Sequence, residues 1–163
     1  MKIIGIVFLF FVFAFLGFYR AYLYFLNLQE IQNCKKMLDY ILLYIESGRL
    51  SVKEIFENID KCGSKTLKKF SEKIMYCLYE NRDITSEEIK DTFCKDSVTS
   101  EILSGVLMFL GKCSATEQIQ KIEIGIKNIN QRYNEIFIEY KQKAKLASSM
   151  GIIMGFFVII ILI

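Results

Sequence analysis

The sequence predicts an all-α fold, an antiparallel helical bundle of about six helices flanked by N- and C-terminal transmembrane helices. Three observations lead to this prediction. Apolar residues in the middle of the chain recur every three or four positions, as they do on one face of an α-helix. The 163 residues include no proline, which leaves long helices uninterrupted. Two stretches near the ends carry no charge over a length that matches a bilayer.

The two uncharged stretches cover residues 3–19 and 146–163. At roughly 1.5 Å of rise per residue, each would form a helix of about 25 Å, close to the hydrocarbon thickness of a membrane. The first is expected to remain as an uncleaved anchor. Phe13, Phe15 and Phe18 place bulky rings where a signal peptidase requires small residues.

The expected parts are an N-terminal transmembrane anchor (1–20), a cytoplasmic helical bundle (21–145) and a C-terminal transmembrane helix (146–163) continuous with the last bundle helix. Basic residues beside a span mark its cytoplasmic side, and Lys141, Lys143 and Lys145 precede the second span. We therefore expect a two-pass protein of the cell membrane, with the bundle in the cytoplasm and both termini on the opposite side.

Small residues at four-residue spacing occur in both apolar stretches. Gly151 and Gly155 form a G-x-x-x-G arrangement with Ala147 one turn earlier, and Gly17 and Ala21 form a similar step in the first stretch. Such strips let two helix backbones approach closely within a bilayer. Two alternatives remain open for these residues: pairing of the two spans within one chain, or docking on another membrane subunit.

The first helix is expected to continue out of the membrane and to end at Gly48, because glycine readily adopts the left-handed conformation that terminates helices. Its apolar face consists of Ile31, Cys34, Leu38, Ile41 and Ile45. Ser51 and Glu54 form a capping-box pattern that opens a short second helix, which is expected to close at Gly63. A third helix is expected over about 66–81.

Thr85 and Glu88 form a second capping box, which predicts a short fourth helix that includes Phe93. A fifth helix is expected over about 99–110, ended by Gly111. Its apolar residues cover most of its circumference, which places it near the centre of the bundle.

Ser114 and Glu117 form a third capping box and open the longest periodic segment. Its apolar residues alternate between spacings of three and four: Ile119, Ile122, Ile126, Ile129, Tyr133, Ile136 and Tyr140. Since only Gly125 weakens the helical pattern, we predict one helix from about residue 115 to the C-terminus, on the order of 70 Å long. We interpret the seam as the bundle's own core rather than as a separate dimeric coiled coil.

Two clusters of charge lie around the predicted third helix. The basic cluster consists of Lys61, Lys65, Lys68, Lys69 and Lys73, and the acidic cluster of Glu80, Asp83, Glu87, Glu88 and Asp91. Charged runs of this kind are most often solvated faces. The alternative for the basic cluster is a docking surface for an oppositely charged partner, or contact with anionic lipid.

No pattern for catalysis, cofactor binding or metal binding occurs in the sequence. Histidine is absent, as are the glycine-rich phosphate-binding and nucleophile-elbow motifs. The five cysteines are scattered and are expected to be reduced core thiols: Cys34, Cys62, Cys77, Cys94 and Cys113. The net charge of +3 is too small and too dispersed for a nucleic-acid partner. We therefore expect a protein that is not an enzyme and has no cofactor.

Two turns and the chain's ending carry a resemblance to a known family. The turn positions are Gly48 and Leu50 in the first turn, and Leu110, Gly111, Ser114 and Gln118 in the second. With the ending that contains Gly151 and Gly155, their order over the whole chain resembles the stage III sporulation protein AB family of endospore-forming bacteria. The chain departs from the family in lacking a proline before Leu50 and an aspartate after Ser114.

That family in turn resembles half of the inner-membrane platform protein of type II secretion, the F component. The resemblance implies a non-enzymatic platform or scaffold subunit of a secretion-like channel complex between mother cell and forespore. It implies the mother-cell membrane as the location. The implied partners are the lipid bilayer, other membrane subunits of the sporulation channel and a secretion-type ATPase on the cytoplasmic side. The alternative is a membrane-tethered helical signalling or sensory bundle, which would need an extracytoplasmic ligand domain that we do not expect at either terminus.

Overall fold

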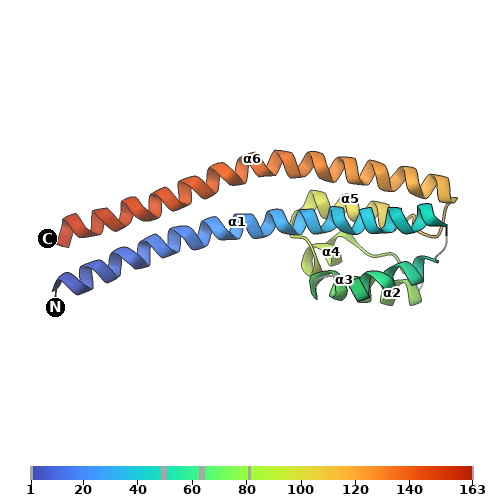
Figure 1. The fold of residues 1–163 in the computed structure, drawn as a ribbon, viewed down its shortest axis with the longest axis horizontal. Helices are drawn as coiled ribbons and strands as arrows, with labels where there is room; N and C mark the ends of the chain where they lie inside the picture. The colour runs from blue at the N-terminus through green and yellow to red at the C-terminus, as the bar shows by residue number, and fades with distance from the viewer. Residues whose placement is uncertain (1, 49–50, 63–64, 81, 163) are drawn as a thin grey trace. The chain divides into compact units, whose positions relative to one another are not determined.

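The computed structural model describes residues 2–48, 51–62, 65–80 and 82–162, with side chains outside the description at 2–4, 6, 60–62, 65–66 and 162. The described residues form six α-helices and no strand, which confirms the all-α prediction (Figure 1). The helices are α1 (Lys2–Ser47), α2 (Val52–Cys62), α3 (Lys65–Tyr79), α4 (Ser86–Thr92), α5 (Ser97–Leu107) and α6 (Ala115–Leu162).

The chain divides into two compact units. The first, here called the apolar helix pair, contains the α1 residues up to Leu28 and the α6 residues from Glu135 onward. The second, here called the bundle, comprises Gln29–Asn134. These two units are defined by compactness. The predicted division into an anchor (1–20), a bundle (21–145) and a C-terminal span (146–163) is defined by the membrane and stays a prediction.

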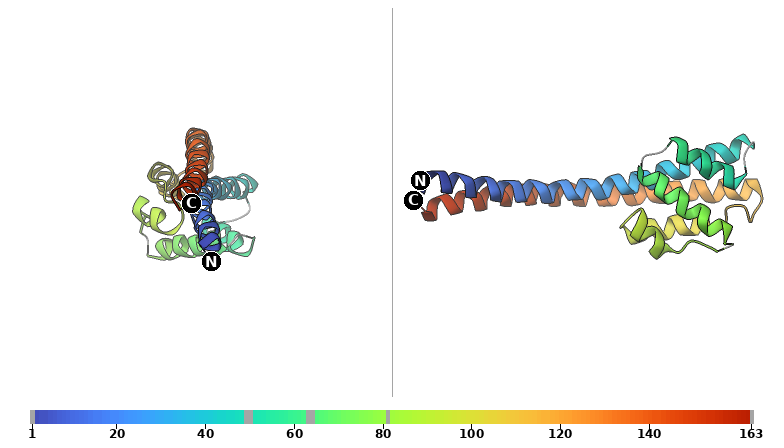
Figure 2. Two further views of the ribbon diagram at one scale, coloured as in Figure 1. Left: turned by 90° about the vertical axis from the view of Figure 1, so that its left-hand side faces the viewer. Right: turned by 90° about the horizontal axis from the view of Figure 1, so that it is seen from below.

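In the apolar helix pair, the ends of α1 and α6 lie side by side and run antiparallel (Figure 2). The rings of Phe10 and Phe156 lie 5.3 Å apart, and those of Tyr24 and Tyr140 lie 5.2 Å apart. Many large apolar side chains point outward, and Phe15 and Ile160 are 70% and 73% exposed. Both helices are long and apolar enough to cross a membrane.

The core of the bundle comes from all six helices. Phe70 of α3 stacks face to face on Phe93, with ring centroids 4.3 Å apart. The other fully buried side chains include Ile31, Leu38, Ile41, Phe56, Ile89, Leu103, Ile122 and Ile129. Since these residues lie at the predicted helical spacings, the apolar periodicity of the sequence corresponds to the core that the structure shows.

All three predicted capping boxes are present. At the start of α4, the backbone N–H of Thr85 donates to the Glu88 carboxylate at 3.0 Å, and the N–H of Glu88 donates to the Thr85 hydroxyl at 3.3 Å. The same reciprocal bonds join Ser51 with Glu54 and Ser114 with Glu117. These bonds satisfy N–H groups that the first helical turn leaves without a partner.

Gly48 follows the last residue of α1 with φ of 61°, which confirms the predicted end of the first helix. This left-handed conformation is strained for residues with a Cβ, so glycine suits the position. The second helix was predicted to end at Gly63 and the third at Asn81, and both of these residues lie outside the described residues.

The predicted bounds of the fourth and fifth helices were wrong by a few residues. Phe93 caps the end of α4 rather than lying within it. The fifth helix begins at Ser97, two residues earlier than predicted, because Asp96 caps it. It ends at Leu107 because tight three-residue turns follow, so Gly111 does not end it.

Two features of α6 match the sequence. The helix is unbroken over 48 residues, which confirms the prediction of one long helix. Ile122 and Ile129 of the heptad seam are 0% and 1% exposed, so this part of the seam belongs to the core of the bundle. Gly125 lies on the same face, where a Cβ would be 2.6 Å from a methyl carbon of Val106. The glycine thus lets α5 approach α6 closely.

Candidate functional site

The small residues of the apolar helix pair face each other across its interface. A Cβ on Gly17 would lie 2.8 Å from the carbonyl oxygen of Ala147, and a Cβ on Gly151 would lie 2.9 Å from that of Phe13. A Cβ on Gly155 would lie 2.6 Å from the ring of Phe10. Real side chains do not tolerate such distances, so only glycine permits this approach of the two backbones.

We call the contact of Gly17, Gly151 and Gly155 with the opposite helix the glycine interface. Ala21 and Ala147 are half-buried beside it. The structure thus brings the two small-residue strips together within one chain, the first of the two alternatives. Beside the interface, an open apolar groove of about 700 Å³ is lined by residues that include Phe10, Phe15 and Ile152.

A polar network ties α5 to α6 inside the bundle. The Asp96 carboxylate accepts hydrogen bonds from the backbone and hydroxyl of Thr99 at 3.0 and 2.7 Å, and from two nitrogens of Arg132 at 2.8 and 3.2 Å. Burial alone would raise the pKa of Asp96. The hydrogen bonds from Arg132 and Thr99 outweigh burial and hold the pKa below its ordinary value.

The same region brings two cysteines together. The thiols of Cys34 on α1 and Cys94 before α5 are buried and hydrogen-bonded to each other. Burial raises the pKa of Cys34 well above its ordinary value, and the bond to Cys94 adds to this. The backbone N–H of Lys95 donates to Glu30 at 3.1 Å, which also joins the α4–α5 connection to α1. Sixty residues of sequence separate the thiols, and no spacing signal reveals such a contact.

The acidic cluster is partly neutralised by basic neighbours. Arg82 donates to both carboxylate oxygens of Glu88 at 2.9 and 3.1 Å. These bonds and the bond from the backbone of Thr85 lower the pKa of Glu88 to about 2. Asp83 forms an ion pair with Lys112 at 2.5 Å. The acidic cluster therefore contributes to the connections around α4 and to the α5–α6 turn.

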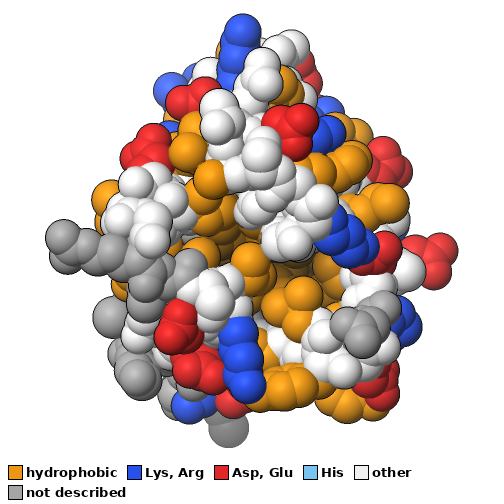
Figure 3. Space-filling view, turned by 90° about the vertical axis from the view of Figure 1, so that its right-hand side faces the viewer, with side chains coloured by type: hydrophobic (Ala, Val, Ile, Leu, Met, Phe, Trp, Pro, Cys, Tyr) orange, Lys and Arg blue, Asp and Glu red, His pale blue; other side chains and the backbone are white. Residues whose placement is uncertain are grey.

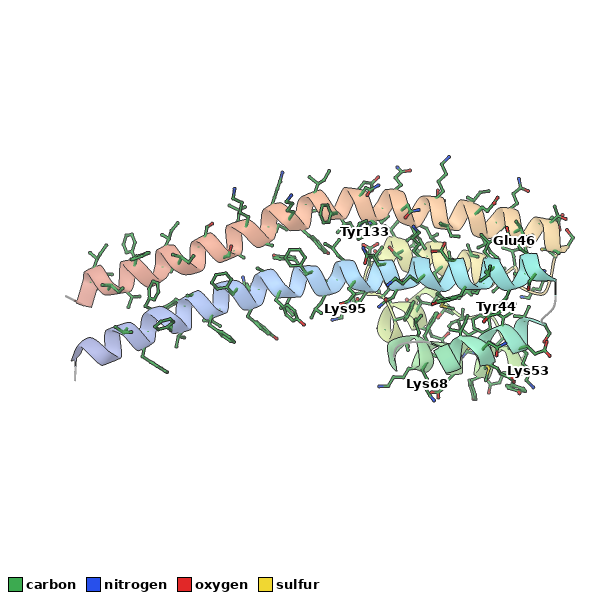
Figure 4. All side chains as sticks on the ribbon, viewed as in Figure 1. Tyr44, Glu46, Lys53, Lys68, Lys95 and Tyr133 are labelled. Atoms are coloured by element: carbon green, nitrogen blue, oxygen red, sulfur yellow. The ribbon has the colours of Figure 1, made fainter. Side chains whose placement is uncertain are left out.

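The basic cluster is described only in part. Lys68 and Lys69 are exposed on α3, and Figure 4 shows Lys68 on the outer side of that helix. Lys73 is half-buried and donates to the Thr92 hydroxyl at 3.1 Å. The side chains of Lys61 and Lys65 lie outside the described residues.

The turn between α5 and α6 contains most of the family-like positions. The N–H of Gly111, at φ of 73°, donates to the Gln118 side chain at 3.3 Å, and that side chain donates to the carbonyl of Cys113 at 2.7 Å. Leu110 is buried and Ser114 caps α6. These residues thus hold the turn in shape. Leu50, the remaining family-like position beside Gly48, lies outside the described residues.

One surface of the bundle was not singled out from the sequence. Tyr76 and Tyr79 on α3 are 57% and 65% exposed, and the ammonium of Lys53 lies 4.5 Å from the centre of the Tyr79 ring. A hollow of about 310 Å³ is lined by Tyr79, Val52, Met75 and neighbouring residues, but not by Tyr76. We call these residues the tyrosine surface. The sequence feature that could have indicated this surface is the apolar run at the end of α3, where Tyr76 and Tyr79 lie on the side opposite the buried face of the helix.

The face of the bundle seen in Figure 3 shows apolar side chains gathered in a hollow that charged side chains surround. Within the described ranges, no group of three or more Cys, Asp or Glu side chains is placed to hold a metal ion.

Comparison with known proteins gives one result. A family model for stage III sporulation protein AB matches residues 2–163, nearly the whole chain. No curated protein and no solved structure matches. The match covers both the apolar helix pair and the bundle, as well as the turn that holds Gly111 and Gln118. The chain therefore belongs to the stage III sporulation protein AB family.

Proposed function

We propose that this protein is a non-enzymatic platform subunit of a secretion-like channel complex between mother cell and forespore. Membership in the stage III sporulation protein AB family is the observation that carries the proposal, since it implies a role in sporulation. In this role the protein holds partners in place. The proposed location is the mother-cell membrane.

The outward-facing apolar side chains support the membrane part of the proposal. Phe8, Phe15 and Ile161 are about seven-tenths exposed along the apolar helix pair. Soluble proteins rarely expose such continuous apolar surface to water. In a bilayer these side chains would contact lipid, while the glycine interface holds the two helices together. The lysines at 141, 143 and 145 favour a cytoplasmic bundle.

A platform must connect its cytoplasmic contacts to the membrane. Both α1 and α6 contribute residues to the apolar helix pair and to the bundle, so two helices join the units. No Gly/Ser-rich linker occurs in the sequence between them. A partner bound to the bundle would therefore act on the same helices that enter the membrane.

The tyrosine surface is the proposed contact for a cytoplasmic partner. Tyrosine and methionine are enriched in protein interfaces; Tyr79 and Met75 line one hollow, and Tyr76 is exposed on the same helix. We propose that a secretion-type ATPase, or a sister subunit that recruits it, binds there. Other membrane subunits of the channel would contact the apolar helix pair.

Crosslinking in sporulating cells tests the proposal. A photoreactive amino acid replaces Tyr79 in the full-length protein, and the captured neighbours are identified by mass spectrometry. We expect an ATPase or a sister subunit to be captured from this position. The matched control carries the photoreactive residue at Glu123, an exposed polar position on α6.

Capture of an ATPase from position 79 and not from position 123 would favour a platform over the alternative of a sensory bundle. Equal capture from both positions would contradict docking on the tyrosine surface. A protein that is washed from membranes by alkaline carbonate would contradict the membrane part of the proposal.

A further inference from the structure

Basic and tyrosine side chains lie at one level of the apolar helix pair. The ring contact between Tyr24 and Tyr140, at 5.2 Å, fixes which parts of α1 and α6 are neighbours. Arg20 lies one turn from Tyr24, and Lys141 and Lys145 lie within five residues of Tyr140. At roughly 1.5 Å of rise per residue, these side chains fall within about 10 Å along the pair. We call Arg20, Tyr22, Tyr24, Tyr140, Lys141 and Lys145 the belt.

The cationic groups of the belt are available for binding. Arg20, Lys141 and Lys145 are exposed and form no ion pair with any described residue. The nearby Lys143 differs, because it is paired with Glu139 one turn away. The belt thus carries three positive charges without a partner in the described chain.

The belt marks the end of the uncharged stretch of exposed apolar surface, and Phe25 and Ile138 beyond it are still exposed. On one side of it, α1 exposes Phe15 and Phe18, and α6 exposes Leu146 and Met150. Charged side chains are absent from these parts of the two helices and begin at the belt. Tyrosine, lysine and arginine at such a boundary are typical of the headgroup region of a bilayer.

We propose that the belt is a binding surface for the headgroups of anionic phospholipids. Arg20, Lys141 and Lys145 would bind the phosphates, and the tyrosines would lie at the headgroup level. This inference rests on the membrane part of the proposed function. It adds the chemical class of lipid that surrounds the protein and the depth at which the pair sits.

The distribution of charge around the pair favours lipid over a folded partner. Lys141 and Lys145 lie one turn apart on α6, whereas Arg20 lies on α1. Charges that are divided between two helices at one level can each be bound by a separate small, mobile lipid headgroup.

Spin-labelled lipids provide the test. The full-length protein is reconstituted into phosphatidylcholine vesicles that contain traces of spin-labelled phosphatidylglycerol or phosphatidylcholine. Electron paramagnetic resonance then measures the fraction of each lipid that the protein immobilises. We expect about a fivefold preference for phosphatidylglycerol, because one basic residue near the surface contributes about that factor. The preference should fall with added sodium chloride.

Two triple variants test whether the lipid preference depends on the belt residues or only on the total positive charge of the protein. Arg20→Gln/Lys141→Gln/Lys145→Gln should lose the preference. Lys36→Gln/Lys90→Gln/Lys127→Gln removes the same charge from exposed positions of the bundle and should keep it. Equal preferences in the two triple variants, or no preference in the unmodified protein, would overturn the inference.

Further arms distinguish the possible failures. Inorganic phosphate should weaken the preference no more than sodium chloride of equal ionic strength; a stronger effect would indicate a site for free anions and overturn the lipid assignment. Resistance to carbonate extraction is measured on the same vesicles. Insertion without lipid preference overturns only the belt inference, whereas failure to insert overturns the membrane part of the proposed function as well.

Discussion

Gly17 and Gly151 lie so close together that a Cβ on either would stand 2.9 Å from the Cα of the other. Backbone therefore meets backbone at the centre of the glycine interface, and the neighbouring helix has no flexible group there that could move aside. Gly5, on the same helix as Gly17, has no neighbour within 4 Å of its Cβ position. This difference provides a matched pair of substitutions.

We expect Gly151→Ala to destabilise the apolar helix pair and Gly5→Ala to leave it unchanged or slightly more stable. Alanine favours a helix over glycine by about 1 kcal/mol, and only Gly5 offers the space to realise that gain. At Gly151 the clash should cost about 1–3 kcal/mol. Unfolding in detergent micelles, followed by circular dichroism, measures both. An equal change in unfolding stability for the two variants would contradict the close contact between Gly17 and Gly151.

Asp96→Ala should destabilise the bundle by about 2–4 kcal/mol, because it removes the cap of α5 and leaves Arg132 without its carboxylate. The Asp96 side chain is only 15% exposed, so water replaces these bonds poorly. Asp96→Asn should be milder, since the amide oxygen can still cap the helix. Chemical denaturation compares the two. An asparagine variant as unstable as the alanine variant would show that charge, rather than capping, dominates.

Acid should loosen α4 through Glu88. Its pKa is lowered to about 2, so its carboxylate stabilises the fold fully above the ordinary pKa of about 4.5. That contribution declines as the pH falls toward 2, where the bonds from Arg82 and Thr85 are lost. The protection factor of the Ile89 amide, whose N–H donates to the carbonyl of Thr85, should therefore fall between pH 4.5 and 2, where its exchange rate is compared with that of an unstructured peptide at the same pH.

Glu88→Gln is the control for the acid effect, because glutamine does not titrate. Its Ile89 amide should exchange faster at neutral pH and show a smaller additional change in acid. An unchanged acid response in Glu88→Gln would assign the effect to other carboxylates.

Thiol labelling should follow burial. We expect iodoacetamide to modify Cys113, which is half-buried, well before Cys34, Cys77 and Cys94, which are buried. The thiol–thiol contact and the raised pKa of Cys34 should slow its reaction further. Mass spectrometry of a Cys62→Ser background follows each site over time. Rapid labelling of Cys34 in the folded protein would contradict the described packing around α1.

The membrane orientation can be tested with a reporter that is active only outside the cytoplasm. Fused between α2 and α3, at Ser64, it should be silent because the lysines beside the second span favour a cytoplasmic bundle. The same reporter fused after Ile163 should be active. Activity at Ser64 would reverse the proposed topology.

Local signals predicted the helices well because they act over a few residues. The capping boxes at Ser51, Thr85 and Ser114 are each complete within four positions, and the structure contains all three. Errors arose at both ends of α5. The cap at Asp96 was not recognised, and tight turns end the helix before the glycine at 111.

Contacts between distant segments were beyond the reach of sequence spacing. The small-residue strips were found, but nothing in the sequence chose between pairing within the chain and docking on a partner. The Cys34–Cys94 contact and the Asp96–Arg132 pair likewise depend on how whole helices pack. The tyrosine surface was missed because Tyr76 and Tyr79 lie off the apolar face that defines the helix.

The two halves of the glycine interface emerge from the ribosome far apart in time. Nearly the whole chain must be translated between Gly17 and Gly151, on the order of ten seconds at typical synthesis rates. During that interval the N-terminal part of α1 cannot yet pair with α6 of its own chain. The α6 helix of a second, fully synthesised copy could pair with it instead, which would produce a domain-swapped dimer. Sparse synthesis, with copies inserted far from one another, would therefore favour pairing of α1 with α6 within one chain.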